Sequence, residues 1–159
     1  MNVQNALESY APSTEAIQVV RATPIVLLVG IMSAGKDTLQ RQLLKSDDYH
    51  SIITHTTRPP RVNSGVLEQN GREYHFVSHE EMQQLIDSQR MIEVNQFGEN
   101  FYGTSVAEFQ TAQTLGQIAF GDIDINGISS FRAISADNVI AMFVFRPVYA
   151  TWLMRLQRR

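Results

Sequence analysis

The residues best suited to chemistry form one short segment, Gly30-Ile-Met-Ser-Ala-Gly35-Lys36, which matches the pattern G-x-x-x-x-G-K. Glycines let such a loop curl until several backbone N–H groups point at phosphate oxygens, and the lysine reaches the outer phosphates of a nucleotide. The loop follows a predicted apolar strand over 24–30 and precedes a predicted helix over 37–45, whose N-terminus adds a positive dipole end. The alternative is a plain glycine-bearing turn, but this position in the chain favours phosphate binding. The residues expected at the phosphates are Gly30, Ser33, Ala34, Gly35, Lys36, Asp37 and Thr38.

The residue after Lys36 departs from the pattern. A serine or threonine is usual there because its hydroxyl binds Mg²⁺, whereas this chain has Asp37 followed by Thr38. A carboxylate is itself a good Mg²⁺ ligand, although it brings negative charge toward the phosphates. Thr38 offers a hydroxyl one position later, so both side chains remain candidate metal ligands.

The elements that must position this loop alternate between strands and helices, which is typical of an α/β protein. Further strands are predicted over 51–57, 73–77, 91–97, 101–103, 117–124 and 139–145. Further helices are predicted over 79–89, 105–115, 127–134 and 149–159. The strand over 24–30 is continuously apolar, as expected for a strand buried in a parallel sheet. The irregular middle of the chain predicts an inserted subdomain over about 54–104.

Two segments match the S-x-x-E pattern of a capping box, Ser78-His-Glu-Glu81 and Ser105-Val-Ala-Glu108. Each is expected to open one of the predicted helices. Residues 1–23 are predicted to be a polar leader, with a short helix near 15–20, that is loosely attached to a domain over 24–159.

Composition excludes several other classes of protein. The 159 residues suffice for one domain, and the net charge of −3 argues against a nucleic-acid-binding protein. No cysteine is present, so disulfides and thiolate metal sites are excluded. The longest apolar run, over 24–32, is about half of a membrane-spanning helix. With no secretory signal recognised, we expect a cytoplasmic protein without membrane contact.

Five further motifs follow the phosphate loop in a fixed order. They are Thr56-Thr-Arg-Pro-Pro-Arg61, Glu73-Tyr-His-Phe-Val-Ser78, Met91-Ile-Glu93, Asn100-Phe-Tyr-Gly-Thr104 and Asp122-Ile-Asp-Ile-Asn-Gly127. Together with the loop, over about 24–159, they resemble the guanylate kinase family, which phosphorylates GMP with ATP and Mg²⁺. The resemblance implies a P-loop NTPase three-layer sandwich with a parallel core sheet and an inserted mixed α/β subdomain that binds GMP.

The resemblance assigns the GMP phosphate to two arginines and two tyrosines. Arg58 and Arg61 would bind it because guanidinium groups match phosphate oxygens, and the hydroxyls of Tyr74 and Tyr102 would add hydrogen bonds. Without the resemblance, arginines around Pro-Pro would be interpreted as a solvated turn and the tyrosines as packing residues.

The same resemblance assigns the base to Glu93. Guanine presents its N1–H and its amino group as neighbouring donors that one carboxylate accepts together, and adenine lacks this pair. Thr54 would donate to the guanine carbonyl, and Thr104 would contact the base edge. The alternatives are an outward-facing charge at Glu93 and ordinary strand threonines.

Acids and arginines complete the implied site. Asp122 would hold Mg²⁺ at the end of a strand, and Asp124 would face the nucleotide two residues on. Lys36, with Arg155 and Arg159 from the start of the family's lid, would neutralise charge on the transferring phosphoryl group. A basic helix C-terminus is the other interpretation of the two arginines.

Two departures from the family leave alternatives open. The connection from Arg61 to Tyr74 is a few residues longer than usual, and the family continues past Arg159 with the rest of the lid and an adenine-contacting segment. A non-catalytic guanylate-kinase-like module that binds a nucleotide or a protein, or a kinase for another phosphorylated acceptor, therefore competes with guanylate kinase. His75 and His79 are interpreted as structural, with no metal cluster of protein ligands. The expected partners are GMP and ATP, and the expected state is a monomer or homodimer.

Overall fold

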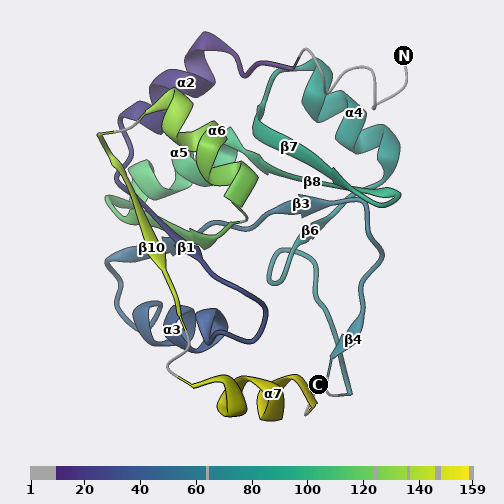
Figure 1. Ribbon diagram of the computed structural model, residues 1–159. Helices are drawn as coiled ribbons and strands as arrows, with labels where there is room; N and C mark the ends of the chain where they lie inside the picture. Colours follow the sequence, from purple (N-terminus) through teal and green to yellow (C-terminus); the bar gives the residue numbers. More distant parts are fainter. Residues whose placement is uncertain (1–9, 64, 124, 136, 146–147, 158–159) are drawn as a thin grey trace.

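The computed structural model describes residues 10–63, 65–123, 125–135, 137–145 and 148–157 (Figure 1). Its core is a parallel four-stranded sheet in the order β10-β1-β9-β2. These strands are β10 (Val139–Phe143), β1 (Ile25–Val29), β9 (Ile118–Asp122) and β2 (Tyr49–Ser51). The inner strand β1 buries Ile25, Leu27 and Leu28 almost completely. The expected apolar strand of a parallel sheet is therefore confirmed.

Two helices pack on this sheet through aromatic side chains. Helix α5 (Val106–Leu115) contacts β9 and β2, and α6 (Ile125–Ile134) contacts β10. Phe109 of α5 and Phe131 of α6 are fully buried, with ring centroids 5.6 Å apart. Burial of such rings contributes much of the apolar stabilisation of the core.

Helix α2 (Thr14–Arg21) corrects the expectation for the N-terminal residues. The short helix predicted near 15–20 is present, but loose attachment is wrong for this segment. Ala16 and Val20 are fully buried in the same apolar cluster as Phe109 and Phe131. The segment is polar overall, yet its two buried apolar residues are four apart and share one helix face. Residues 1–9 lie outside the described residues.

The inserted part forms a second, mixed sheet beside the first (Figure 1). Its order is β6 (His75–Phe76), β3 (His55–Thr56), β8 (Asn100–Ser105) and β7 (Met91–Phe97). Helix α4 (His79–Asp87) covers it with Met82 and Ile86, which pack on Met91 and Phe101. The predicted capping box at Ser78 is confirmed, because Glu81 and Ser78 each accept a hydrogen bond from the other's backbone N–H.

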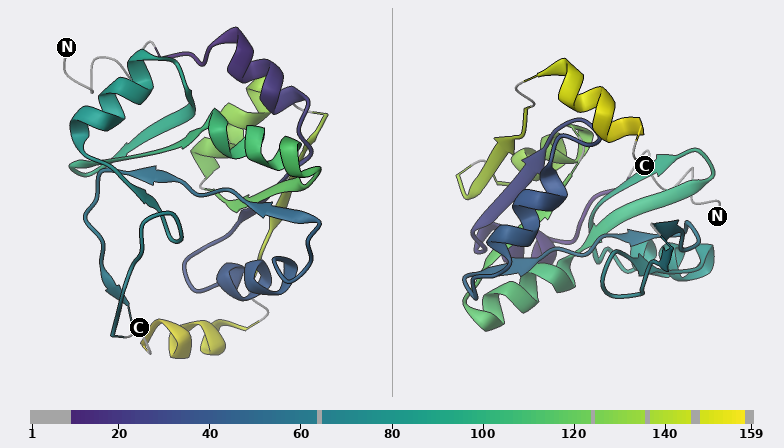
Figure 2. Two further views of the ribbon diagram at one scale, coloured as in Figure 1. Left: turned by 180° about the vertical axis from the view of Figure 1, so that it is seen from behind. Right: turned by 90° about the horizontal axis from the view of Figure 1, so that it is seen from below.

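Two predictions about the irregular middle are wrong, and this part of the chain also contains a hairpin that the sequence did not indicate. The strand predicted over 51–57 is two strands in different sheets, β2 and β3, because the chain crosses between the sheets at 52–54. The segment 59–71 contains an unpredicted hairpin, β4 (Val62–Asn63) and β5 (Val66–Leu67), which extends away from the second sheet (Figure 2). The second capping box does not form: Ser105 begins α5 without a side-chain cap, and Glu108 accepts the N–H of Ile53 instead.

The remaining helices lie near the carboxyl ends of the parallel strands. Helix α3 (Lys36–Leu43) follows the phosphate loop, and α7 (Tyr149–Gln157) follows β10. Figure 1 shows both at the end of the molecule opposite α2. The indole N–H of Trp152 in α7 donates to the carbonyl of Met32, 3.0 Å away, which attaches α7 to the phosphate loop.

Two histidines stack between β3 and β6. The rings of His55 and His75 have centroids 4.6 Å apart, and burial followed by the charge interaction with His75 lowers the pKa of His55 from 6.5 to about 4. Between these pH values the unfolded chain binds a proton at His55 that the folded chain does not bind. Stability from this residue is therefore complete above pH 6.5 and is lost as the pH falls toward 4.

We expect His55→Phe, which keeps a ring in the stack, to reduce this acid sensitivity. Between about pH 7 and pH 4.5 the natural chain should lose about 2 kcal/mol more unfolding free energy than the variant, a figure that allows for partial solvent screening. Urea unfolding at the two pH values measures both losses. Equal losses would show that His55 does not titrate in this range.

Candidate functional site

The phosphate loop has a strained, tightly packed backbone. Ser33 adopts φ 59° and Gly35 φ 109°, and α3 begins immediately afterwards at Lys36. A Cβ on Gly30 would lie 2.5 Å from the carbonyl oxygen of Val144, so only glycine fits there. The ammonium group of Lys36 donates to the carbonyl of Gly30 at 2.8 Å. Ala34 is buried, and the loop therefore forms a compact backbone cradle at a helix N-terminus.

An acidic side chain lies beside this cradle. Asp122 ends β9 in register with Leu28 of the neighbouring β1, so it reaches the same edge of the sheet as the loop. Desolvation and the negative charge of Asp37 raise the pKa of Asp122, while Lys36 opposes the rise. These three charged groups therefore act on one another directly.

The two carboxylates suit a magnesium ion. No group of three potential protein ligands occurs among the described residues. Mg²⁺, however, is usually held by one or two carboxylates together with water and substrate phosphates. Asp37 and Asp122 provide such oxygen ligands next to the cradle, so the residues present fit the ion. Thr38 instead lines a cavity of about 380 Å³, together with Arg41 and Gln42 of α3 and with Lys45, which follows this helix.

Arg58 occupies the centre of the predicted GMP phosphate site. Its side chain is 6% exposed, its guanidinium lies 5.2 Å from the centre of the Tyr74 ring, and it also faces Phe76. Tyr74 and Tyr102 are in edge contact at 6.2 Å. Arg58 therefore does not lie in a solvated turn. Arg61 is exposed.

Glu68 is the partner of Arg58 that sequence analysis missed. The carboxylate accepts from Arg58 at 2.8 Å, from the backbone N–H of Arg61 at 2.8 Å and from the amide of Asn63 at 3.0 Å. Burial alone would raise the pKa of Glu68, but these hydrogen bonds hold it below its usual value. The connection from Arg61 to Tyr74 thus supplies a carboxylate that orients Arg58. Nothing local distinguishes Glu68 from other glutamates, because its contact depends on the hairpin.

The insertion faces the phosphate loop through Tyr74. Burial and then the negative charge of Asp122 raise the pKa of Tyr74. Such a charge effect requires the β6 end of the insertion and the acidic end of β9 to be close. The predicted phosphate-binding tyrosine therefore lies within electrostatic range of the predicted metal-binding acid, although 48 positions separate them.

The predicted base-binding residues form a buried pair. Glu93 is 7% exposed and Thr104 3%, and the hydroxyl of Thr104 donates to Glu93 at 2.9 Å. The amide of Asn95 donates to the other carboxylate oxygen at 2.5 Å. Glu93 is therefore not an outward-facing charge. Asn95 was missed, although the period-2 geometry of a strand puts it on the same face. Thr54 is half-buried just before β3.

Three predicted residues are not fully described. Asp124 and Arg159 lie outside the described residues, and so does the side chain of Arg155. The backbone of Arg155 belongs to α7.

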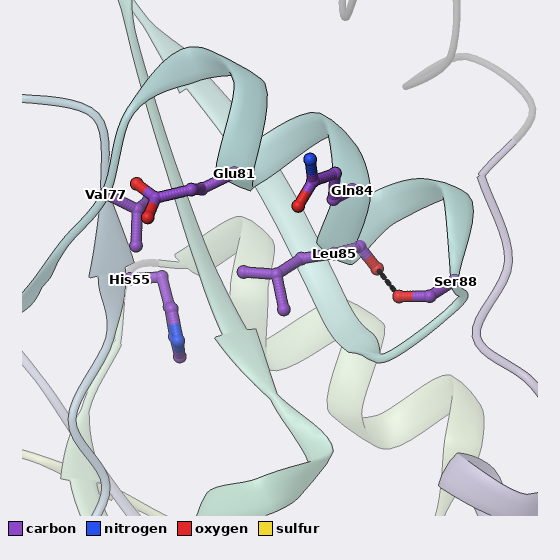
Figure 3. A pocket seen from close by; sticks show the side chains of 6 residues that line it. All are labelled: His55, Val77, Glu81, Gln84, Leu85 and Ser88. Atoms are coloured by element: carbon purple, nitrogen blue, oxygen red, sulfur yellow. Dashed lines mark hydrogen bonds between the residues drawn. The ribbon is translucent and has the colours of Figure 1, made fainter.

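A second cavity of about 500 Å³ lies under α4 (Figure 3). It is lined by His55, Val77, Glu81, Gln84, Leu85 and Ser88. Glu81 is engaged in the capping box, and Ser88 donates to the carbonyl of Leu85. We therefore interpret this lining as part of the α4 packing.

Comparison with known proteins places the chain in one family. A family model described as guanylate kinase matches residues 21–159. The guanylate kinase of Francisella tularensis subsp. holarctica (strain LVS) is 35% identical over 139 residues, which are 85% of this chain and 71% of that protein. The chain belongs to the guanylate kinase family. The resemblance carried by the ordered motifs is thereby confirmed.

Other guanylate kinases agree with this assignment. That of Campylobacter jejuni (strain RM1221) is 40% identical over 122 residues, which are 76% of this chain. The chain spans only 58% of that relative's length. The crystal structure of guanylate kinase from Anaplasma phagocytophilum superposes with a TM-score of 0.64 at 24% identity, over 87% of this chain and 66% of that one. The predicted α/β fold of a P-loop NTPase with an insertion is therefore confirmed.

Proposed function

We propose that this chain is a guanylate kinase that transfers the γ-phosphoryl group of ATP to GMP, yielding ADP and GDP. The observation that carries the proposal is the buried carboxylate of Glu93, held by Thr104 on the insertion sheet. Its two oxygens accept from Thr104 and Asn95, and a carboxylate oxygen can accept more than one donor. The N1–H and amino group of guanine are two such donors, whereas adenine would leave the carboxylate without them. Thr54 would donate to the guanine carbonyl.

The acceptor phosphate would bind beside Arg58. The guanidinium is already oriented by Glu68 and stacked on Tyr74, so little side-chain freedom would be lost on binding. Arg61, Tyr74 and Tyr102 would supply further donors. Because Asp122 acts electrostatically on Tyr74, a phosphate bound at Tyr74 would lie near the donor site.

The donor phosphates would rest on the backbone cradle and on Lys36. Asp122, with Asp37 or Thr38, would hold the Mg²⁺ that accompanies ATP, and the charge interaction between the two carboxylates favours Asp37 over Thr38. When bound, Mg²⁺ would neutralise negative charge on the phosphates. In this proposal Asp124 would face the nucleotide, and Arg155 and Arg159 would neutralise charge on the transferring phosphoryl group.

Transfer would then need positioning and charge neutralisation, with no protein nucleophile. The insertion would align a GMP phosphate oxygen with the γ-phosphorus and exclude water that would otherwise hydrolyse ATP. Lys36 would neutralise the negative charge that moves onto the leaving diphosphate group during transfer.

The setting of the reaction is also a proposal. No described helix is long and apolar enough to cross a membrane. We infer a cytoplasmic kinase of small molecules that acts as a monomer or homodimer and needs neither nucleic acid nor membrane.

The direct test is GDP formation by the 159-residue chain from ATP, Mg²⁺ and GMP, with AMP in a parallel reaction. We expect GDP, with AMP phosphorylated at least about a hundredfold more slowly, because the carboxylate of Glu93 has no matching donors on adenine. GMP binding without GDP formation would instead support the non-catalytic module. Equal rates with AMP would contradict the assignment of Glu93.

A further inference from the structure

One buried carboxylate contacts both sheets of the molecule. Glu108 lies in the first turn of α5 and is 8% exposed. Its Oε2 accepts the backbone N–H of Ile53 at 3.0 Å and lies 3.4 Å from Nε2 of His50. Its Oε1 lies 2.9 Å from Nε2 of His75. Three partners from different segments therefore converge on one side chain.

These partners sit where the insertion joins the core. His50 is in β2 of the core sheet, Ile53 is in the crossing from β2 to β3, and His75 is in β6 of the insertion sheet. Helix α5 itself packs on β2 and β9 and follows β8, the strand by which the chain leaves the insertion. Glu108 thus connects the insertion to the core through hydrogen bonds with Ile53 and His75 and a close contact with His50.

The same sequence pattern elsewhere in the chain has a different outcome. In Ser78-x-x-Glu81 the glutamate caps its own helix, whereas in Ser105-x-x-Glu108 it turns toward the crossing. The hydroxyl of Ser105 is consequently buried without a hydrogen-bond partner. An unsatisfied buried polar group costs free energy. The contacts of Glu108 at the crossing must therefore stabilise the folded chain by more than the missing cap of α5 would.

We propose that Glu108 is a positioning residue that sets the orientation of the insertion relative to the core sheet. Thr54 directly follows Ile53, and Tyr74 directly precedes His75. A shift at Glu108 would therefore displace a predicted base-binding residue and a predicted phosphate-binding residue together. Displacements of about 1 Å at such groups are enough to slow catalysis strongly. The consequence for GMP rests on the proposed kinase function, but the orientation itself does not.

The surroundings of Glu108 indicate that it positions the insertion and does not merely stabilise α5. Besides His50 and His75, the third titratable neighbour is His55, which stacks on His75 and whose Nδ1 is buried without a partner. The stack restricts how His75 can follow any movement of the carboxylate. A glutamate that served only α5 would need none of these contacts.

The orientation can be measured without any enzymatic activity. Since the chain has no cysteine, spin labels can be attached to cysteines introduced only at exposed Gln42 of α3 and exposed Asp87, at the end of α4 opposite its capping box. We expect the distribution of distances between the labels to broaden or shift in Glu108→Ala. The matched variant Glu81→Ala, which removes the equivalent glutamate of α4, should keep the original distribution.

A second variant covers the case in which Glu108→Ala does not fold. His75→Phe removes the partner in the insertion and leaves the hydrogen bond from Ile53 to Glu108. It should alter the distribution in the same direction. The proposal is overturned if Glu108→Ala and His75→Phe, where they fold, keep the natural distance distribution. It is also overturned if Glu81→Ala changes the distribution as much as they do.

Kinetics give a separate test that depends on the proposed function. In Glu108→Ala the KM for GMP should rise about tenfold while the KM for ATP changes less than about twofold, because the phosphate loop belongs to the core. Glu108→Gln retains an acceptor for Ile53 and should recover part of the loss. An equal rise in both KM values contradicts positioning. A chain with no kinase activity would refute the proposed function and leave the label experiment decisive for Glu108.

Discussion

Lys36→Ala is expected to slow phosphoryl transfer to GMP by about 10³-fold or more while leaving GMP binding unchanged. The ammonium group sits at the phosphate cradle, bonded to the carbonyl of Gly30, and acts electrostatically on Asp122. Removing a preorganised cation from the place where negative charge develops raises the barrier directly. GMP, by contrast, would be held by the insertion. Steady-state GDP formation and GMP titration measure the two effects on one preparation.

Lys45→Ala is the matched control for this prediction. Lys45 follows α3, is exposed and donates to Gln42, so its removal takes the same charge from a nearby surface position. Its rate should stay within about twofold of the natural chain, since exposed side chains rarely contribute more. Equal transfer rates for the natural chain and Lys36→Ala would show that this lysine has no role in phosphoryl transfer. Equal slowing by both lysine variants would indicate a general effect of charge.

The second large effect is expected at Glu93. Replacing Glu93 with alanine should reduce the preference for GMP over AMP by about a hundredfold or more. The reason is that alanine cannot accept hydrogen bonds from the two guanine donors. Thr104 and Asn95 would lose their shared acceptor, so some loss of stability should accompany the change. The measurement is the ratio of kcat/KM for GMP to that for AMP.

This ratio is its own control for folding. A smaller folded fraction lowers kcat/KM for both nucleotides by the same factor, so its effect cancels in the ratio. The control substitution Glu80→Ala, at an exposed position of α4, should leave the ratio unchanged. If Glu93→Ala retains the natural ratio, the base must be recognised by other residues.

Local sequence patterns were sufficient for the elements that depend on neighbours along the chain. The apolar run at β1, the loop that ends at Lys36, strand β7 and the capping box at Ser78 all follow from residues within a few positions of one another. The order of motifs around this loop also identified the family. Backbone geometry and helix capping are local effects, so a short window of sequence contains their causes.

The same local patterns failed where the chain changes partners. The strand expected over 51–57 had a suitable composition throughout, but its two ends pair with different sheets. The polar sequence of helix α2 predicts loose attachment, but its two buried side chains pack against α5 and α6. Composition cannot indicate which distant surface an apolar pair will meet.

The site divides in the same way. The sequence by itself predicted which residues would carry the chemistry, including Lys36, Arg58, Glu93 and Asp122. Only the tertiary structure decided that Glu68 orients Arg58, that Asn95 supports Glu93, that the charge of Asp122 reaches Tyr74 and that Glu108 bonds across the crossing. Two of these contacts join residues that are 48 and 55 positions apart, and the two between closer residues depend on a hairpin and on strand pairing. Side-chain hydrogen bonds and charge effects depend on distance in space, which the chain acquires only when its sheets assemble.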